Sequence, residues 1–161
     1  MDKQLKTIAQ AARREMKDFA RKNPGIGDPC DLACFCALAS YFFKIVAERF
    51  DYDVILVEGV AFDFFDFKNS LSDNINHCWT EYNGKIYDLT ATQFGSSRTV
   101  HIVNKTNKNY YAINAGIKVD DHNLSESFRE WPSEQAPILF KRELQKRAEK
   151  VVSRLRAARF A

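Results

Sequence analysis

The sequence predicts an α+β domain, with helices toward both ends and antiparallel strands between them. Three observations favour this class. The chain has 161 residues, of which 45% are apolar, and this is enough for one independent hydrophobic core. Apolar residues recur at helical spacing near both ends, whereas the middle carries β-branched runs around an Asn-Gly pair. With six glycines and four prolines, the chain does not resemble a disordered or fibrous protein.

The N-terminal third is predicted to form two helices. The residues that place the first helix over 2–22 lie on one helical face: Leu5, Ile8, Ala9, Ala12, Met16 and Phe19. An Asn-Pro-Gly run then stops it. The second helix is expected to begin between residues 28 and 36 and to run to about Phe50. It is apolar nearly all round, so we expect it to be buried.

The middle of the chain is predicted to form strands. Residues 54–62 are rich in β-branched side chains and indicate a strand, and the aromatic and polar segment 62–72 is expected to be a loop. The clearest local signal lies at 76–90, where two strand-like runs flank Asn83-Gly84. An Asn-Gly pair between such runs predicts a two-residue hairpin.

Two further strands, at 99–103 and 110–113, and a C-terminal helix over 138–160 complete the predicted order. This helix is basic, with eight Lys or Arg and two Glu from Lys141 to Ala161, so an anionic partner is a possible role for it. Its apolar stripe favours a different interpretation. We expect the helix to dock on the domain with its charges in water.

No repeat or linker divides the chain, so we expect one domain over 1–161, with a core at about 28–115 between the two flanking helices. No apolar stretch is long enough to cross a bilayer, and the N-terminus lacks the apolar centre of a secretory signal. Three of the four cysteines crowd into residues 30–36, unlike a spaced disulfide framework. These features predict a cytoplasmic protein with reduced thiols.

The hairpin register brings a histidine and a carboxylate together. If the turn is Asn83-Gly84, His77 lies opposite Thr90 and Trp79 opposite Asp88, all on one face. Asp88 is then the diagonal neighbour of His77, within reach of side-chain contact. A carboxylate there can fix the imidazole tautomer and favour the imidazolium form.

A nucleophilic thiol needs such a base nearby. Cys30, Cys34 and Cys36 all lie near the expected start of the second helix, where the helix dipole and a cationic imidazole lower a thiol pKa. Spacing alone does not choose among the three.

Three strings in the sequence point to a family: Cys36-Ala37-Leu38-Ala39-Ser40, Asn76-His77-Cys78-Trp79, and Asp88-Leu89-Thr90-Ala91-Thr92-Gln93-Phe94. Together they resemble the transglutaminase-like branch of the papain-like cysteine superfamily, in particular its small bacterial and phage members. The resemblance implies that Cys36 is the nucleophile, His77 the base and Asp88 the orienting acid. It also implies a papain-like core in which the helix bearing the cysteine packs on an antiparallel sheet, with no cofactor and no required metal.

The activity implied is acyl transfer through a thioester on peptide or glutamine side-chain amides, with a protein or peptide as substrate. Water as acceptor gives proteolysis or deamidation, and an amine gives cross-linking; the sequence leaves these open. Trp79 and Gln93 are candidate substrate-binding residues, although Trp79 can equally shield the site or pack in the core.

Other interpretations of the same residues stay open. Buried cysteines are by default core residues. A zinc site is disfavoured because the chain has no Cys-x-x-Cys pair. Finally, Cys30 stands where papain-type enzymes carry an oxyanion glutamine, and Cys34 where related members often carry glycine. The alternative is therefore a catalytically inactive binding module that contacts a protein or nucleic-acid partner through the basic C-terminal helix.

Overall fold

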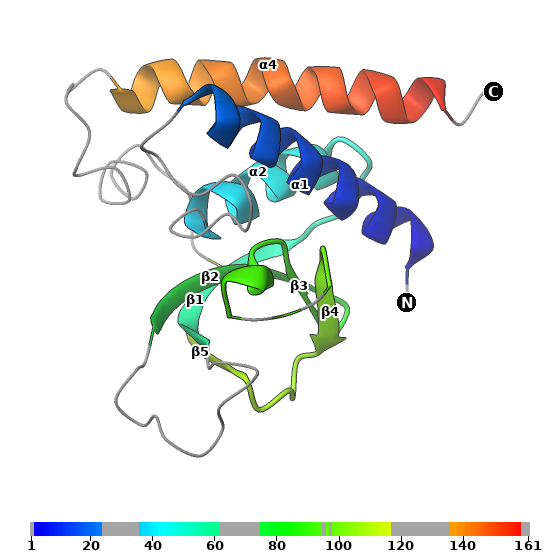
Figure 1. Ribbon diagram of the computed structural model, residues 1–161. Helices are drawn as coiled ribbons and strands as arrows, with labels where there is room; N and C mark the ends of the chain where they lie inside the picture. The colour runs from blue at the N-terminus through cyan, green and yellow to red at the C-terminus, as the bar shows by residue number, and fades with distance from the viewer. Residues whose placement is uncertain are drawn as a thin grey trace.

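The computed structural model describes residues 2–23, 36–61, 75–94, 96, 98–116 and 136–158. In this part of the chain, three helices lie on one side of a five-stranded antiparallel sheet (Figure 1). The predicted α+β class is thereby confirmed. No helix within the described ranges is long and apolar enough to cross a membrane.

Helix α1 spans Lys3–Lys22, as the sequence predicts. Asp2 caps its N-terminus, because the Asp2 carboxylate accepts hydrogen bonds from the amides of Gln4 at 2.9 Å and Leu5 at 3.0 Å. Helix α2 spans Cys36–Glu48, so it begins within the predicted window. Its apolar surface is buried as expected.

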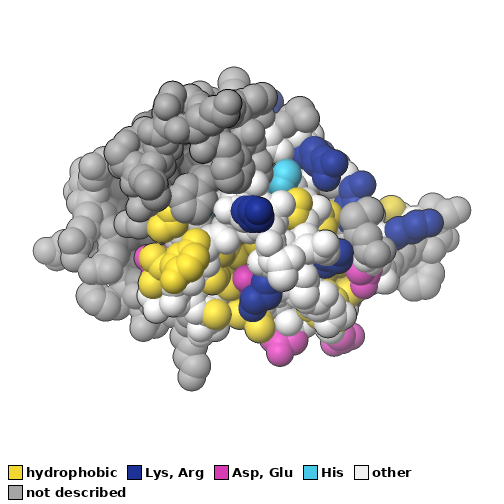
Figure 2. Space-filling model, turned by 90° about the horizontal axis from the view of Figure 1, so that it is seen from below, with side chains coloured by type: hydrophobic (Ala, Val, Ile, Leu, Met, Phe, Trp, Pro, Cys, Tyr) yellow, Lys and Arg dark blue, Asp and Glu magenta, His cyan; other side chains and the backbone are white. Residues whose placement is uncertain are grey.

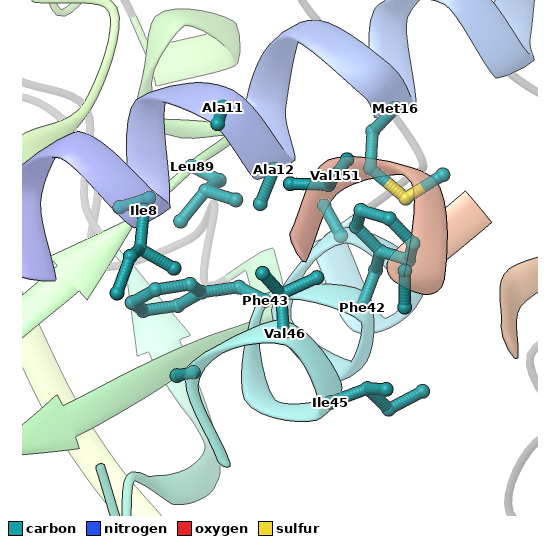
Figure 3. Packing of buried hydrophobic residues seen from close by; sticks show 14 of the residues in the cluster. Ile8, Ala11, Ala12, Met16, Phe42, Phe43, Ile45, Val46, Leu89 and Val151 are labelled. Atoms are coloured by element: carbon teal, nitrogen blue, oxygen red, sulfur yellow. The ribbon is translucent and has the colours of Figure 1, made fainter. Parts of the chain in front are cut away.

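The helices meet in the main hydrophobic core, and Figure 3 shows side chains of α1 and α2 interlocking there. The labelled residues from these two helices are Ile8, Ala11, Ala12, Met16, Phe42, Phe43, Ile45 and Val46. Leu89, from the segment after the hairpin, joins the same cluster. The core therefore ties the helix layer to the part of the sheet that carries the candidate acid, Asp88.

Helix α4 spans Ala136–Ala157 and lies across α1 and α2 on the outside of the helix layer (Figure 1). Its buried side chains form one stripe: Leu144, Ala148, Val151 and Val152. This confirms the docked interpretation of the basic helix. Arg147 is turned toward α1, where its guanidinium lies 2.7 Å from the carboxylate of Glu15.

The strands are β1 Ile55–Ala61, β2 Ile75–Tyr82, β3 Lys85–Asp88, β4 His101–Asn104 and β5 Tyr110–Ala115. Their order in the sheet is β4-β3-β2-β1-β5, so the last two strands, consecutive in the chain, lie at opposite edges. On β5, Tyr111 is 66% and Ile113 58% exposed, and hydrophobic side chains gather on the sheet side of the molecule beside basic ones (Figure 2). The predicted loop at 62–72 lies outside the described residues.

The hairpin forms with the predicted register. Asn83 and Gly84 have φ of 46° and 68°, as a type I′ turn requires, and Thr80 is paired with Tyr87. Strand β2 pairs with β1 along seven residues but with β3 only over Thr80–Tyr82. In the described residues, the β3 side of β2 is therefore free of strand pairing near Cys78, and α2 begins there.

Candidate active site

His77 and Asp88 form a buried pair. His77 Nε2 lies 2.7 Å from Asp88 Oδ2, and the side chains are 0% exposed. The other carboxylate oxygen, Oδ1, accepts hydrogen bonds from the amide of Thr90 at 2.8 Å and its hydroxyl at 3.2 Å. Tyr110 donates its hydroxyl to Oδ2 at 2.9 Å. Asp88 is therefore fully hydrogen-bonded and fixes which nitrogen of the imidazole faces it.

The Tyr110 hydroxyl on β5 can reach Asp88 across β1 because β1 carries small side chains on this face of the sheet. Gly59 lies opposite His77, and Ala61 lies opposite Tyr110. The ring of Trp79 covers Gly59 and packs edge-on against the Tyr110 ring, with centroids 5.2 Å apart. A Cβ on Gly59 would lie 2.5 Å from the Trp79 ring, so glycine is needed here for packing.

Cys36 is the first residue of α2 and is half-buried. Its thiol is hydrogen-bonded to the His77 ring and to the thiol and backbone of Cys78. Because His77 Nε2 is held by Asp88, the contact to Cys36 uses the other ring nitrogen, Nδ1. The three predicted catalytic residues therefore meet at one place, in the order thiol, imidazole and carboxylate.

The unpaired edge of β2 explains how a helix start reaches this histidine. The Ser40 hydroxyl, one turn after Cys36, donates a hydrogen bond to the carbonyl of Cys78 at 3.0 Å. The Cys36 sulfur is also hydrogen-bonded to the backbone of Cys78. The first turn of α2 therefore occupies the hydrogen-bonding positions that a neighbouring strand would otherwise fill.

The charges of the site favour a thiolate-imidazolium pair. Hydrogen bonding from Cys78 is the largest influence on Cys36, and together with the His77 ring it lowers the pKa of the thiol well below its ordinary value despite burial. Burial acts against a charged His77, but the Asp88 carboxylate and the Cys36 sulfur outweigh it and raise the pKa of His77 to about 10. Burial likewise opposes ionisation of Asp88, yet His77 holds its pKa below the usual range.

Gln93 and Trp79, the two predicted substrate-binding residues, both lie beside His77. Gln93 is half-buried, with its amide nitrogen 3.5 Å from His77 Nδ1 and 3.2 Å from the Thr90 hydroxyl. Trp79 is 0% exposed and tilted against the imidazole, with ring centroids 6.0 Å apart. The full burial of Trp79 and its packing against the imidazole favour shielding of His77 over contact with a substrate, and both expected roles stay predictions.

Arg13 of α1 holds the segment that follows Asp88. It is buried, and its guanidinium donates hydrogen bonds to the carbonyl of Leu89 and, at 3.1 Å, to the hydroxyl of Thr92. The short 3-10 helix Ala91–Phe94, which carries Gln93, follows directly. The helix layer thereby positions both the acid and the glutamine of the site.

Sequence reasoning missed several residues that support the site. Thr90 follows from the predicted register, which places it on the face of His77. Tyr110 does not, because nothing local indicates that β5 pairs with β1. Cys78 was missed because strand alternation puts it on the face opposite His77, whereas Cys36 stands at the strand edge and contacts both residues.

The remaining cysteines bear on the zinc alternative. Cys30 and Cys34 lie outside the described residues. Among the residues that the structure describes, no group of three His, Cys, Asp or Glu side chains could hold a metal ion.

Comparisons with known proteins do not assign this chain to a family. The sequence matches no family model, and no curated protein matches it. Among solved structures, the chain is similar to a crystal structure of a protein described only as a genomics target, with 12% identity, a TM-score of 0.49, and coverage of 91% of this chain and 78% of that chain. At this level of similarity the comparison carries no argument, and function must be inferred from the site itself.

Proposed function

We propose that the protein is a thiol-dependent acyl-transfer enzyme with a papain-like core, in which Cys36, His77 and Asp88 act as nucleophile, base and orienting acid. The observation that carries the proposal is the contact of the Cys36 thiol, at a helix start, with a histidine whose far nitrogen is held by a buried carboxylate at 2.7 Å. The cysteine-helix and histidine-strand arrangement supports the papain-like assignment.

In the proposed reaction, the Cys36 thiolate attacks the carbonyl carbon of a peptide or glutamine side-chain amide. The carbonyl electrons move to oxygen, where the backbone amide of Cys36, at the start of α2, can stabilise the charge. The His77 imidazolium gives its Nδ1 proton to the leaving amine as the C–N bond breaks and the thioester forms. The neutral imidazole then takes a proton from water, or from an acceptor amine, as that group attacks the thioester, and the C–S bond breaks to release the product and the Cys36 thiolate.

A purely structural role explains the arrangement less well. A buried ion pair such as His77 and Asp88 contributes little net stability compared with apolar side chains of the same volume. Extending it to a half-buried thiol gives no further packing gain, because Cys36 belongs to neither buried hydrophobic cluster. A catalytic role explains better why Cys36, His77 and Asp88 are polar residues in hydrogen-bond contact and not apolar packing residues.

Acylation by p-nitrophenyl acetate tests the proposal. We expect acetylation at Cys36 in preference to the other cysteines, with formation of a hydroxylamine-sensitive thioester that peptide mass spectrometry can locate. His77→Ala removes the base and should slow Cys36 acylation at pH 7 by about 100-fold or more. His101→Ala is the matched control. His101 is paired with Asp88 across β3 and β4 and its ring lies 6.2 Å from that of Tyr110, but its Nδ1 is 3.1 Å from the Ser96 hydroxyl, and its loss leaves the hydrogen bonds of Asp88 to His77, Thr90 and Tyr110 in place.

We expect the His101→Ala protein to be acylated at the wild-type rate. Equal acylation of all four cysteines, or an unchanged rate in a folded His77→Ala protein, would show that the thiol, imidazole and carboxylate do not act together. Glutamine-containing peptides, with and without an added primary amine, then separate hydrolysis from cross-linking.

A further inference from the structure

The candidate site contains a second thiol that the proposed mechanism does not use. Cys78 neighbours His77 on β2, and its side chain is hydrogen-bonded to the thiol of Cys36. The two residues are 42 positions apart in the chain, and the Ser40 contact to the Cys78 carbonyl at 3.0 Å fixes the start of α2 against β2 at this point. The sulfurs of Cys36 and Cys78 are thus held next to each other, one by helix α2 and the other by strand β2.

Packing does not explain Cys78. It is half-buried and, like Cys36, belongs to neither buried hydrophobic cluster. Both residues retain exposed surface, so the pair lies near the surface, where a small oxidant can approach it. A serine or alanine would fill the same place on the strand without bringing a second oxidisable group against the nucleophile.

We propose that Cys36 and Cys78 form a redox pair, in which a hydroperoxide oxidises Cys36 and Cys78 then closes a reversible disulfide that switches the site off. The inference rests on the reactive Cys36 of the proposed function. A sulfur bound to Cys78 can neither attack a carbonyl nor accept further oxygen. The disulfide therefore both inactivates the nucleophile and protects it from irreversible oxidation.

The chemistry balances with the groups present and the hydroperoxide. The Cys36 thiolate attacks the terminal oxygen of the hydroperoxide, the O–O bond breaks, and the departing alkoxide takes the proton of the His77 imidazolium to become an alcohol. Cys36 is now a sulfenic acid. The Cys78 sulfur attacks it, and the hydroxide that leaves combines with the Cys78 proton to give water. Two thiol sulfurs are oxidised and one peroxide is reduced.

The order of the two steps follows from the electrostatics of the pair. In the reduced site, the hydrogen bond to the Cys36 sulfur and its negative charge, together with burial, raise the pKa of Cys78, which stays a thiol. Oxidation of Cys36 to a neutral sulfenic acid removes that negative charge. Cys78 then ionises more readily and can attack the sulfenic acid.

The test uses the full chain in a Cys30→Ser/Cys34→Ser background, so that only the two thiols of interest remain. The reduced protein is treated with tert-butyl hydroperoxide and digested without reductant. We expect a peptide pair linked through Cys36 and Cys78, complete loss of iodoacetamide labelling at Cys36, and recovery of labelling with dithiothreitol. Wild-type protein treated in the same way should lose and recover labelling equally, which checks that the background has not altered the site.

The matched control adds Cys78→Ser. Without the second thiol, prolonged peroxide treatment should convert Cys36 to the sulfinic acid, and dithiothreitol should not restore labelling. Oxidation of Cys36 with the Cys78 thiol left free, and no linked peptide, would overturn the inference. That result leaves the proposed function intact if reduced protein is still acylated at Cys36. Conversely, a linked peptide without His77-dependent acylation would overturn the proposed function alone.

Discussion

At the scale of single residues, the central feature is a histidine and an aspartate kept charged without exposure to water. Removing one partner of such a pair leaves the other buried and uncompensated, which destabilises a protein far more than the intact pair stabilises it. Asp88 is held by His77, Tyr110 and Thr90 together. Its charge therefore orients three side chains, and its effect on the site should depend on pH.

The variant Asp88→Asn tests this pH dependence. The raised pKa of His77, about 10, gives stability that is complete below its unfolded value of about 6.5 and is lost as pH rises through 10. The lowered pKa of Asp88 gives stability that is complete above about 3.9 and is lost as pH falls through the folded value. The free energy of unfolding of the wild type, measured with urea, should therefore exceed that of the variant most between pH 4 and 6.5, by about 2–4 kcal/mol.

The Asp88→Asn variant should also make the Cys36 thiol less acidic and therefore less reactive near neutral pH. Without the carboxylate, the pKa of His77 falls, and the pH midpoint of Cys36 alkylation by iodoacetamide should rise by about one unit or more. A free energy of unfolding that differs from the wild type by the same amount at every pH would contradict the account, because an uncharged hydrogen bond has no such pH profile.

At the scale of secondary structure, the sequence predicts what is local and misses what is distant. The Asn-Gly turn defines the hairpin register, and extending that register beyond the last observed pair, Thr80 with Tyr87, predicts that His77 and Asp88 are neighbours. The position of Tyr110 could not be predicted, because sheet order depends on pairing between strands far apart in the chain. Choosing Cys36 among three cysteines required the family resemblance, since each occupies a similar position before or at the helix start.

Gly59 shows how closely β1 must approach its neighbours. A Cβ at this position would lie 2.2 Å from the carbonyl oxygen of Tyr111 on β5, a backbone atom that cannot rotate away. Gly59→Ala should therefore destabilise the protein by about 3 kcal/mol or more. Gly84→Ala is the matched comparison, because that site has φ of +68° and open space, and should lose only about 1 kcal/mol.

Urea unfolding monitored by tryptophan fluorescence measures both variants, since Trp79 lies against Gly59. In the Gly59→Ala protein we also expect slower acylation of Cys36, because Gly59 is paired with His77. Equal free energies of unfolding for the two variants would show that β1 and β5 can move apart to accept the added Cβ at little cost in stability.

At the scale of the whole molecule, α4 is joined to α1 by charge as well as by its apolar stripe. The guanidinium of Arg147 lies 2.7 Å from Glu15, 2.8 Å from Glu143, and 5.0 Å above the ring of Phe19. Glu15 is only 5% exposed. The prediction of a docked basic helix was correct, but the buried acidic partner on α1 was not predictable, because periodicity places Glu15 without showing what it faces.

Arg147→Met should destabilise the protein by about 2–4 kcal/mol, since it leaves the Glu15 carboxylate buried beside Arg154 alone, at 3.6 Å. The double variant Arg147→Met/Glu15→Gln removes the stranded charge and should recover most of that loss. Thermal or urea unfolding of the two proteins measures the difference. If the double variant is as unstable as the single one, the loss comes from the packing of Arg147 on Phe19 and its charge is unimportant.

The spacing of the three candidate catalytic groups along the chain also bears on how the molecule assembles. His77 and Asp88 are 11 residues apart within one hairpin, so a short segment can bring them together early, by closing a small loop. Cys36 arrives from a helix whose placement depends on the packing of α1 and α4 around it. In the proposed enzyme, a nascent or partly folded chain would therefore carry a Cys36 thiol of ordinary pKa, and the reactive thiolate would form only in the folded molecule.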